Sequence, residues 1–371
     1  MNILVVNPIL FSSERNVIPE VVTIKETMIY NMCMGFVANG HRVTLTASAA
    51  YQPVRPENAY DFEVVFFKSV LTWFFPPSVL PLSFDFKNYL KANHSQFDLV
   101  ICSEVFAFYS LFSCLICPSK TVIWHEMTVH QKKFRKLASR IWHKVVVPLF
   151  MRNVRQVIPR SEKARLFIGK YMKNVSPEYV EHGINLSYFE FSKEKKRQLI
   201  SSSQLIYRKN VESIIEIFSR LVAKKGYEDI HLLIAGRGVY RPFLEKTVAR
   251  LNLQDHVFFT GFLGREELNR FIRESLAFLI NTRQDLNMIS IPESVVSGTP
   301  VITNLIPASC DYIYKEKLGI AKDDWNENDL IEIIQTNSFY VDNCIAFRDQ
   351  LSIQSCAKKI VDIYLSCCND E

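Results

Sequence analysis

Short runs of apolar residues alternate with helical stretches along this chain, and the alternation starts twice. Candidate strands of the first half lie at 3–6, 42–47, 64–67, 99–102, 122–124 and 157–158, with a helix at 24–38. Candidate strands of the second half lie at 204–207, 232–235, 257–260, 278–281 and 301–303, with helices at 211–223, 241–251 and 265–276. This alternation predicts α/β architecture with parallel βαβ units, whose ligand sites lie at the carboxyl ends of the strands. The 371 residues suffice for two such domains, each with its own core.

The cysteines and the first residues bear on where the chain resides. Nine cysteines are scattered, and several, such as Cys102, lie inside apolar runs. Scattered cysteines predict a reducing compartment, the cytoplasm. Cys114 and Cys117 form a lone C-x-x-C without further ligands at metal spacing, so no metal site is predicted. The run from Met1 to Asn7 has no basic leader or cleavage site, so we expect no signal peptide.

The segment 281–303 contains two carboxylates at a spacing that suits a nucleotide. Asp285 precedes a short helix expected to open near Pro292, and Glu293 lies in its first turn. Free backbone N–H groups at 289–292 would attract an anion, and a carboxylate there can accept two hydrogen bonds from a vicinal diol. These features fit the diphosphate and ribose of a nucleotide. Alternatively, Glu293 only complements the helix dipole and Asp285 is a solvated loop residue.

Three other features carry candidate chemistry. Arg208 and Lys209 precede a predicted helix, where two cations can neutralise a departing nucleoside diphosphate, or can simply be solvated. Gly236-Arg-Gly238 follows a predicted strand but is shorter than the dinucleotide-binding fingerprint. His125 also follows a strand, a place where a lone histidine is more often structural than functional.

The segment 132–155 carries eight basic residues and no acidic one. Four apolar residues recur there at helical spacing and define one face: Phe134, Leu137, Ile141 and Val145. Such a helix either lies on an anionic lipid surface, or packs its apolar face on the core and leaves its basic face solvated. No nucleic-acid-binding motif accompanies the charge, so nucleic acid is not an expected partner.

The segment 69–84 carries no charge over sixteen residues and contains three prolines. A membrane-spanning helix needs about twenty apolar residues and tolerates proline only with help, so a span is not predicted. We expect an apolar loop. It lies either near an acceptor site or membrane surface, or against the core.

Several motifs together resemble those of a known enzyme family. One motif is the run Glu293-Ser-Val-Val-Ser-Gly-Thr-Pro-Val-Ile302, which has a carboxylate eight residues before its glutamate. This motif is similar to the E-x7-E region of retaining, nucleotide-sugar-dependent glycosyltransferases of family-4 type. Asn39-Gly-His-Arg-Val-Thr44 resembles the family's GHEVTV, and His182-Gly-Ile-Asn185 resembles its NGVD turn. The resemblance covers nearly the whole chain and is strongest from Tyr207 to Ile302.

The resemblance implies a GT-B fold, in which two Rossmann-like domains face each other across a cleft. Residues 1–185 would form the acceptor domain, and residues 186–345 the nucleotide-sugar donor domain. Residues 346–371 would form a terminal helix that crosses back and packs on the first domain.

The resemblance also implies roles for single residues. Glu293 would bind the ribose hydroxyls, Asp285 the donor sugar, and Lys209 together with Arg208 the diphosphate. His125 would contact the donor sugar from the first domain. Of these, His125, Asp285 and Lys209 are the expected catalytic residues. The remaining donor-binding positions lie in turns or use backbone atoms: Gly236, Gly238, Thr260, Phe262, Ile289, Ser290 and Ile291.

The implied reaction moves a hexose from a nucleoside diphosphate sugar, such as a UDP or GDP sugar, to a glycan or lipid-linked acceptor, with retention of configuration. No cofactor and no essential metal are expected, and the chain has no D-x-D motif at a strand end. The implied setting is bacterial surface polysaccharide biosynthesis in the cytoplasm, either free or peripheral on the inner face of the membrane.

Three features depart from the family pattern. No glycine lies between Asn7 and Met34, where the family has a glycine-rich loop. Asp285 replaces the first glutamate, and Ser201-Ser-Ser203 occupies the place of an arginine. These departures leave two alternatives open: a catalytically silent GT-B protein that acts as a binding partner, and a nucleotide-sugar epimerase of similar fold.

Overall fold

The computed structural model describes residues 1–11, 18–55, 59–131, 136–284 and 288–369 of the chain. The chain forms two compact units, Met1–Gly183 with Ile353–Glu371, and Ile184–Ser352. The second unit extends past residue 345, where the sequence placed the boundary. It does so because helix α12 (Asn337–Phe347) and the 3-10 turn η8 (Arg348–Leu351) both pack against helix α9 (Ser290–Val296) of the same unit.

The first unit is built on one parallel sheet. Its strands are β1 (Asn2–Val6), β2 (Arg42–Ser48), β3 (Glu63–Phe67), β4 (Leu99–Cys102), β5 (Thr121–His125) and β6 (Gln156–Pro159). They pair in the order β3-β2-β1-β4-β5-β6, and every pairing is parallel. The strands predicted for the first half are therefore confirmed within a few residues. The strand order reverses between β1 and β4, which makes this the topological switch point of the sheet.

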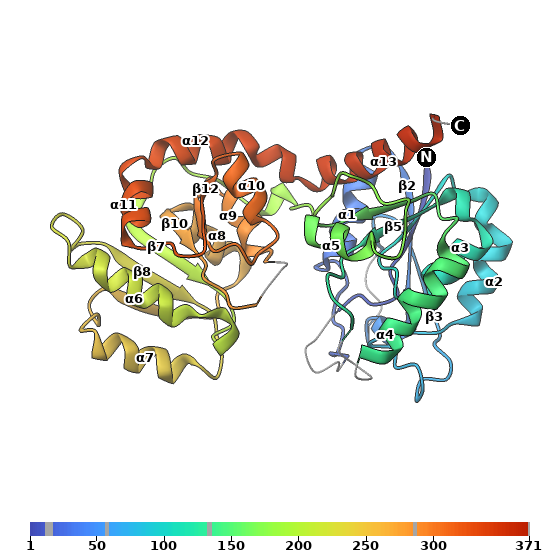
Figure 1. Ribbon diagram of the computed structural model, residues 1–371, viewed down its shortest axis with the longest axis horizontal. Helices are drawn as coiled ribbons and strands as arrows, with labels where there is room; N and C mark the ends of the chain where they lie inside the picture. Colours follow the sequence, from blue (N-terminus) through green and yellow to red (C-terminus); the bar gives the residue numbers. More distant parts are fainter. Residues whose placement is uncertain (12–17, 56–58, 132–135, 285–287, 370–371) are drawn as a thin grey trace. The chain divides into compact units, whose positions relative to one another are not determined.

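Helices cover both faces of this sheet (Figure 1). They are α1 (Met28–Ala38), α2 (Phe84–Asn93), α3 (Phe108–Ile116), α4 (Leu137–Ile141), the π-helix η5 (Trp142–Met151) that continues α4, α5 (Glu162–Ile168) and α13 (Ile353–Asn369). Successive residues of β1 point to opposite faces, so Ile3 and Val5 join a core with α1 and α13. Leu4 and Val6 join a second core with α2, α3 and η5.

Helix α1 begins later than the sequence predicted. The Thr27 side chain accepts a hydrogen bond from the backbone N–H of Tyr30 at 3.2 Å, so Thr27 is the N-cap and the helix starts at Met28 rather than residue 24. The segment before it is irregular, although Ile24 is fully buried. Ile24 therefore packs on the core from a loop rather than from a helix.

The terminal helix expected within 346–371 is α13, and it packs along α1 (Figure 1). Its apolar residues Ile353, Cys356 and Ile360 are buried in the core that contains β1. Gly35 of α1 allows this close approach. A Cβ at Gly35 would lie 2.7 Å from the carbonyl carbon of Ile353, inside van der Waals distance. Tyr364 also donates from its hydroxyl to the carbonyl of Asp98 at 2.9 Å, which ties α13 to the first sheet.

The second unit repeats the parallel α/β plan. Its strands are β7 (Lys196–Ser202), β8 (His231–Ala235), β9 (Val257–Gly261), β10 (Ser275–Leu279), β11 (Val301–Thr303) and β12 (Gly319–Ala321), in the order β12-β11-β10-β7-β8-β9. Besides α9 and α12, its helices are α6 (Val211–Val222), α7 (Arg241–Arg250), α8 (Arg265–Arg273), α10 (Cys310–Lys315) and α11 (Glu327–Gln335). All pairings are again parallel, and the switch point lies between β7 and β10.

One predicted strand of the second unit is wrong. Residues 204–207 are not a strand, and β7 instead runs from Lys196 to Ser202. Its first half is charged because it starts at the exposed end of the sheet, where Lys196 pairs with Glu274 at 2.7 Å and Arg197 with Asp229 at 2.5 Å. The buried part of the strand is the short run that includes Leu199 and Ile200. The charged residues Lys196 and Arg197 are thus the start of a central strand of the sheet.

The uncharged segment 69–84 is a loop up to Ser83, as predicted, and part of it packs on the core while part is exposed. Val79, Leu80 and Leu82 are buried in the core with α2 and α3. Trp73 is 81% exposed and Phe74 57% exposed. No helix in the described part of the chain is long and apolar enough to cross a membrane.

The packing of α13 on α1 yields a stability prediction. Alanine favours helix over glycine by about 1 kcal/mol, so propensity alone predicts that Gly35→Ala stabilises the protein. The clash with the Ile353 carbonyl predicts the opposite, a loss of roughly 1–3 kcal/mol of unfolding free energy. Urea unfolding measures the sign. A midpoint above that of the unsubstituted protein would show that α13 does not lie this close to α1.

Candidate functional site

The sequence-predicted donor residues of the second unit come from loops that follow β7, β8, β9 and β10. Because all these strands are parallel, their carboxyl ends meet at one edge of the sheet. The loop after β7 carries Arg208 and Lys209, and the loop after β10 leads into α9 and Glu293. These two loops flank the switch point, the place where open α/β sheets bind ligands.

The two loops at the switch point are joined by hydrogen bonds. Tyr207–Lys209 forms a 3-10 turn, η7, before α6. Arg208 and Lys209 therefore lie in a turn, whereas a strand had been predicted directly before them at 204–207. Thr282 Oγ1 and the backbone N–H of Arg283 both donate to the carbonyl of Arg208, at 3.1 and 2.9 Å. Arg208 Nη1 donates in return to the carbonyl of Gln284 at 2.9 Å. The turn with both cations is therefore held against the loop that leads toward α9.

Arg283 is a member of this site that the sequence analysis missed. Its guanidinium lies 4.0 Å from the ring centre of Tyr207 and donates to the Tyr207 carbonyl at 2.5 Å. It also pairs with Glu212 of α6 at 2.5 Å. Glu212 balances the charge of Arg283. Because Arg283 follows β10 and contacts Tyr207 after β7, it joins these two loops. Its position two residues after Asn281, at a strand end, was the signal available in the sequence.

The two glycines after β8 permit close packing of loops. Gly236 has a φ of +132°, and a Cβ on it would overlap the carbonyl of Ser203. A Cβ on Gly238 would overlap the carbonyl of Leu205 in the same way. The backbone N–H of Leu205 donates to the Arg237 carbonyl at 2.9 Å across this contact. Both glycines therefore bring the loops after β7 and β8 together at the predicted site.

Thr260 and Phe262 lie at the end of β9 on the same sheet edge. Thr260 is half-buried, whereas the Phe262 ring is 70% exposed. The Arg237 guanidinium lies 5.8 Å from the centre of that ring. The backbone N–H of Gly236 donates to the Gly261 carbonyl at 2.7 Å, which connects the loops after β8 and β9. The Phe262 ring is thus exposed beside Thr260, at two of the predicted donor-binding positions.

Glu293 lies in the first turn of α9, close to where the sequence placed it. Burial raises the pKa of its carboxyl to about 7, although the positive charge of Arg265 acts in the opposite direction. Among the described residues its carboxylate has no hydrogen-bond or ion-pair partner. Ile289 precedes α9 and Ser290 begins it, while Ile291 is fully buried.

Asp285, the other carboxylate of the predicted pair, lies outside the described residues.

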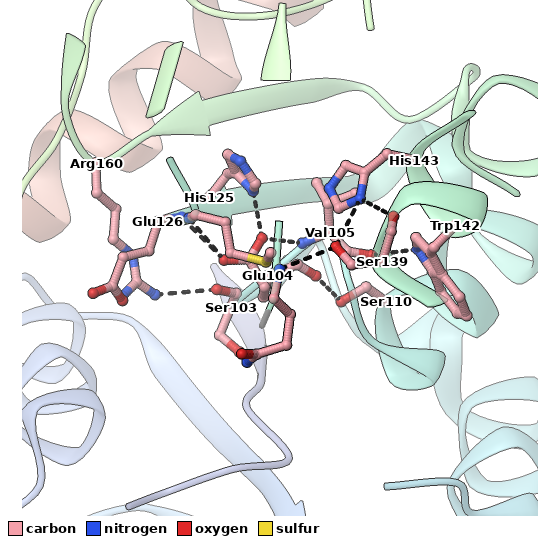
Figure 2. A network of polar contacts seen from close by, with 12 residues as sticks. Ser103, Glu104, Val105, Ser110, His125, Glu126, Ser139, Trp142, His143 and Arg160 are labelled. Atoms are coloured by element: carbon pink, nitrogen blue, oxygen red, sulfur yellow. Dashed lines mark hydrogen bonds and ion pairs between the residues drawn. The ribbon is translucent and has the colours of Figure 1, made fainter. Parts of the chain in front are cut away.

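His125 ends β5 in the first unit, and its side chain is fully buried. Its Nδ1 forms an ion pair with Glu104 Oε1 (Figure 2). Its ring also stacks on Phe167, with ring centres 6.0 Å apart. Its Nε2 has no hydrogen-bond partner among the described residues. Glu104 was not singled out from the sequence, although it follows β4 just as His125 ends β5.

A second ion pair lies beside the first. Arg160, directly after β6, donates from Nη1 to Glu126 at 2.6 Å and from Nη2 to the Ser103 carbonyl at 3.2 Å (Figure 2). Its guanidinium stacks on Trp124 at 3.8 Å, and Nη1 also lies 2.8 Å from His182 Nε2. Burial lowers the pKa of Arg160, while Glu126 and Glu104 oppose that effect. Arg160 therefore joins the ends of β4, β5 and β6.

The predicted residues thus fall into one cluster in each unit. In the second unit, Lys209, Gly238, Thr260 and Glu293 are brought to one sheet edge with the other donor positions. In the first unit, His125 lies in a buried polar network at the carboxyl ends of three strands (Figure 2).

Comparisons with known proteins agree with this arrangement. A family model described as Glycosyltransferase Family 4 matches residues 26–188, and one described as Glycosyl transferases group 1 matches residues 187–337. An alpha-monoglucosyldiacylglycerol synthase of Streptococcus pneumoniae is 26% identical over 192 residues, or 47% of this chain and 43% of that protein. The O-antigen biosynthesis glycosyltransferase WclY of Escherichia coli is 24% identical over 169 residues, or 44% of this chain and 45% of that protein. The matches span less than half the length of either relative.

Solved structures show the same fold. Anabaena Alr3699/HepE in complex with UDP superposes with a TM-score of 0.65 at 13% sequence identity, covering 99% of this chain and 100% of that chain. The two parallel six-stranded sheets with their helices match the GT-B architecture of that structure. The chain therefore belongs to the glycosyltransferases of the group 1 and family 4 type and has the GT-B fold.

Proposed function

We propose that the protein transfers a hexose from a nucleoside diphosphate sugar to a glycan or lipid-linked acceptor, with retention of configuration. The observation that carries the proposal is the placement of Arg208, Lys209 and Glu293. Arg208 and Lys209 lie in the turn after β7, and Glu293 lies in the first turn of α9 after β10, so two cations and a half-buried carboxylate flank the switch point of the second sheet. The two cations suit the charged diphosphate of a nucleotide, and the carboxylate suits the hydroxyl groups of its ribose.

Each residue then has a chemical role. The Glu293 carboxylate accepts hydrogen bonds from both ribose hydroxyls, which supplies the partners it lacks among the described residues. Lys209 and Arg208 neutralise the charge that develops on the diphosphate when the bond from sugar C1 to its oxygen breaks. Arg208, which lies next to Lys209 in the same turn, fills the role of the missing arginine. Asp285 and His125 bind the donor sugar.

The acceptor hydroxyl oxygen forms its bond to C1 on the face that the diphosphate leaves, and the hydroxyl proton passes to the departing diphosphate oxygen. Thr260 and Phe262, with Gly236 and Gly238, surround the base. The backbone at Ile289, Ser290 and Ile291 faces the distal phosphate and sugar. In this scheme the two cations neutralise the leaving group, so we expect neither a cofactor nor an essential metal, and transfer should persist in EDTA.

The comparisons support the choice of substrates. HepE was solved with UDP, which favours a uridine nucleotide as the first donor to test. The Streptococcus relative is named for a diacylglycerol product and the Escherichia relative for O-antigen biosynthesis. We therefore propose a lipid-linked or glycan acceptor in bacterial surface glycoconjugate synthesis, and a cytoplasmic location that includes the inner face of the membrane.

The basic helix supports contact with an anionic membrane. Residues 132–135 of the basic segment, which include Phe134, lie outside the described residues. The apolar stripe of Leu137, Ile141, Val145 and Leu149 is 46–61% exposed, so it does not pack on the core. The opposite face, with Trp142 and Val147, is the buried one. The exposed basic residues are Lys136, Arg140, Lys144 and Arg152. An exposed apolar stripe bordered by cations is typical of helices that lie in a lipid interface.

The donor site predicts selective stabilisation by one nucleotide. A thermal-shift panel of UDP, GDP, ADP, TDP and CMP with their common sugars should show a rise with one base, because ligand at 100 times its dissociation constant stabilises by about 2.7 kcal/mol. Glu293→Ala should abolish that rise through loss of the ribose contacts. Glu266→Ala, an exposed carboxylate on α8, is the matched control and should keep it. No rise with any nucleotide would favour a catalytically silent protein.

Donor affinity should also depend on pH through Glu293. Because burial raises the pKa of its carboxyl to about 7, much of it is protonated at neutral pH, and the protonated form cannot accept from both hydroxyls. Affinity for the nucleotide sugar should rise as pH increases through 7 and level off above it. Below 7 the dissociation constant should grow about tenfold per unit, measured by calorimetry. Glu293→Gln should bind weakly with no such slope; an equal slope in that variant would assign the titration to another group.

The exposed stripe predicts binding to anionic vesicles. Replacing Ile141, Val145 and Leu149 by serine should reduce co-sedimentation with phosphatidylglycerol vesicles, since each removed side chain forfeits roughly 1–3 kcal/mol of apolar burial. Leu166→Ser changes a similarly exposed leucine on α5 and should bind as the unsubstituted protein does. If the triple variant sediments equally well, the stripe is not a lipid-binding surface.

A further inference from the structure

The turn that carries Arg208 and Lys209 has little local support for its shape. It is a 3-10 turn of three residues, and the next residue, Asn210, has a φ of +53°, in the left-handed region that most side chains avoid. Asn210 is also the N-cap residue of α6, yet within the described part of the chain its side chain makes no capping hydrogen bond. The conformation of the turn therefore depends on contacts from other segments.

The side chain of Arg283, in the loop after β10, supplies three such contacts. Its Nη1 donates to the Tyr207 carbonyl at 2.5 Å, and its guanidinium lies 4.0 Å from the centre of the Tyr207 ring. Its Nη2 forms the ion pair with Glu212 Oε1 at 2.5 Å. The backbone N–H of Arg283 adds a fourth contact, the hydrogen bond to the Arg208 carbonyl.

The side-chain contacts of Arg283 lie on both sides of the two cations. Tyr207 directly precedes Arg208, and Glu212 follows Lys209 by three residues, in the first turn of α6. One guanidinium therefore holds both ends of the segment that carries the cations. A guanidinium suits this task because its N–H groups donate in fixed directions while its flat face stacks on an aromatic ring.

The contacts of Arg283 are sheltered from water. The side chain of Glu212 is 13% exposed and that of Arg283 is 33% exposed. Fully exposed ion pairs contribute little to stability, because water and salt screen them, whereas hydrogen bonds to charged groups that are partly desolvated contribute more. The contacts of Arg283 are therefore strong enough to order a short turn.

We propose that Arg283 is a positioning residue for the diphosphate, which fixes the turn at 207–209 so that Arg208 and Lys209 are ordered before the nucleotide binds. The inference rests on the proposed function, in which these two cations neutralise the diphosphate, and it involves residues of the second unit alone. Cations that are ordered in advance do not have to lose conformational entropy when the ligand binds, which raises affinity. Arg283 acts through the turn and touches no substrate.

Hydrogen exchange of backbone amides tests the ordering without any ligand. Arg283→Met removes the three side-chain contacts but keeps the backbone N–H that donates to Arg208. In the full chain it should speed exchange in peptides that cover the turn, where the N–H groups of Lys209 and Asn210 are hydrogen-bonded. Equal exchange in this variant and the unsubstituted protein would overturn the proposal.

Two further variants are controls for the exchange measurement. Arg220, in the last turn of α6, pairs with Glu327 at 2.8 Å, so Arg220→Met removes an arginine and its ion pair from the same unit. It should leave exchange of the turn unchanged, and an increase equal to that in Arg283→Met would contradict a specific role. Arg283→Lys keeps the charge but lacks the planar fork, so it should restore slow exchange only in part.

The affinities of UDP and uridine test the link to the diphosphate. Arg283→Met should weaken UDP binding roughly 10-fold, the effect of one hydrogen bond to a charged group. Uridine binding should change little, because uridine lacks the phosphates that the two cations neutralise. Calorimetry measures UDP directly and uridine by displacement. A purely structural role would weaken both ligands alike, and equal losses would overturn the proposal.

A combined variant separates positioning from direct contact. In a background with both Arg208→Met and Lys209→Met, the change Arg283→Met should have little further effect on UDP, because the cations that it positions are gone. An undiminished 10-fold loss in that background would show that Arg283 binds the diphosphate itself, and would overturn the proposal. Failure of the unsubstituted protein to bind UDP or any other nucleotide would contradict the proposed function, while the exchange measurement still decides whether Arg283 orders the turn.

Discussion

Parallel strand pairing is the constraint on which both candidate sites depend. When all six strands of a sheet run in one direction, the loops that follow them meet at one edge, and the switch point leaves room between two of those loops. In the second unit this brings together Lys209 and Glu293, which are 84 residues apart in the sequence (293 − 209). In the first unit it brings Glu104 to His125 in the same way. The chemistry is assembled by topology rather than by any local motif.

Close backbone packing then makes these edges rigid enough to hold a ligand. Gly236 and Gly238 let the loop after β8 lie against the loop after β7, and Arg283 joins the latter to the loop after β10. The first unit uses side chains for the same purpose. Glu104 gathers three backbone N–H groups, and Arg160 joins three strand ends. No glycine lies between Asn7 and Met34 after β1, and a polar network lies at the carboxyl ends of β4, β5 and β6.

The features that depend on local sequence pattern could be predicted from the sequence. The buried strands were recognisable from apolar runs, and Glu293 from its place at a helix start. The central strand β7 was missed because its first residues are charged, and only Leu199 and Ile200 show its burial. The exposed face of the helix at 137–151 was also not predictable, since periodicity defines an apolar stripe but not which face meets the core. Glu104 and Arg283 were missed because their roles are contacts with residues distant in sequence.

The half-buried carboxylates of Glu104 and Glu293 have different environments, which composition alone does not reveal. Glu104 is surrounded by donors, and they hold its pKa below the ordinary value despite burial. Glu293 is also half-buried but has no partner among the described residues, and desolvation raises its pKa to about 7. A carboxylate with its hydrogen bonds already made is suited to hold a neighbour in place. One that is desolvated and unpaired is unfavourable for the free protein, and a ligand with two hydroxyls relieves that cost. The difference in pairing is the reason for proposing Glu293, rather than Glu104, as the ligand-binding carboxylate.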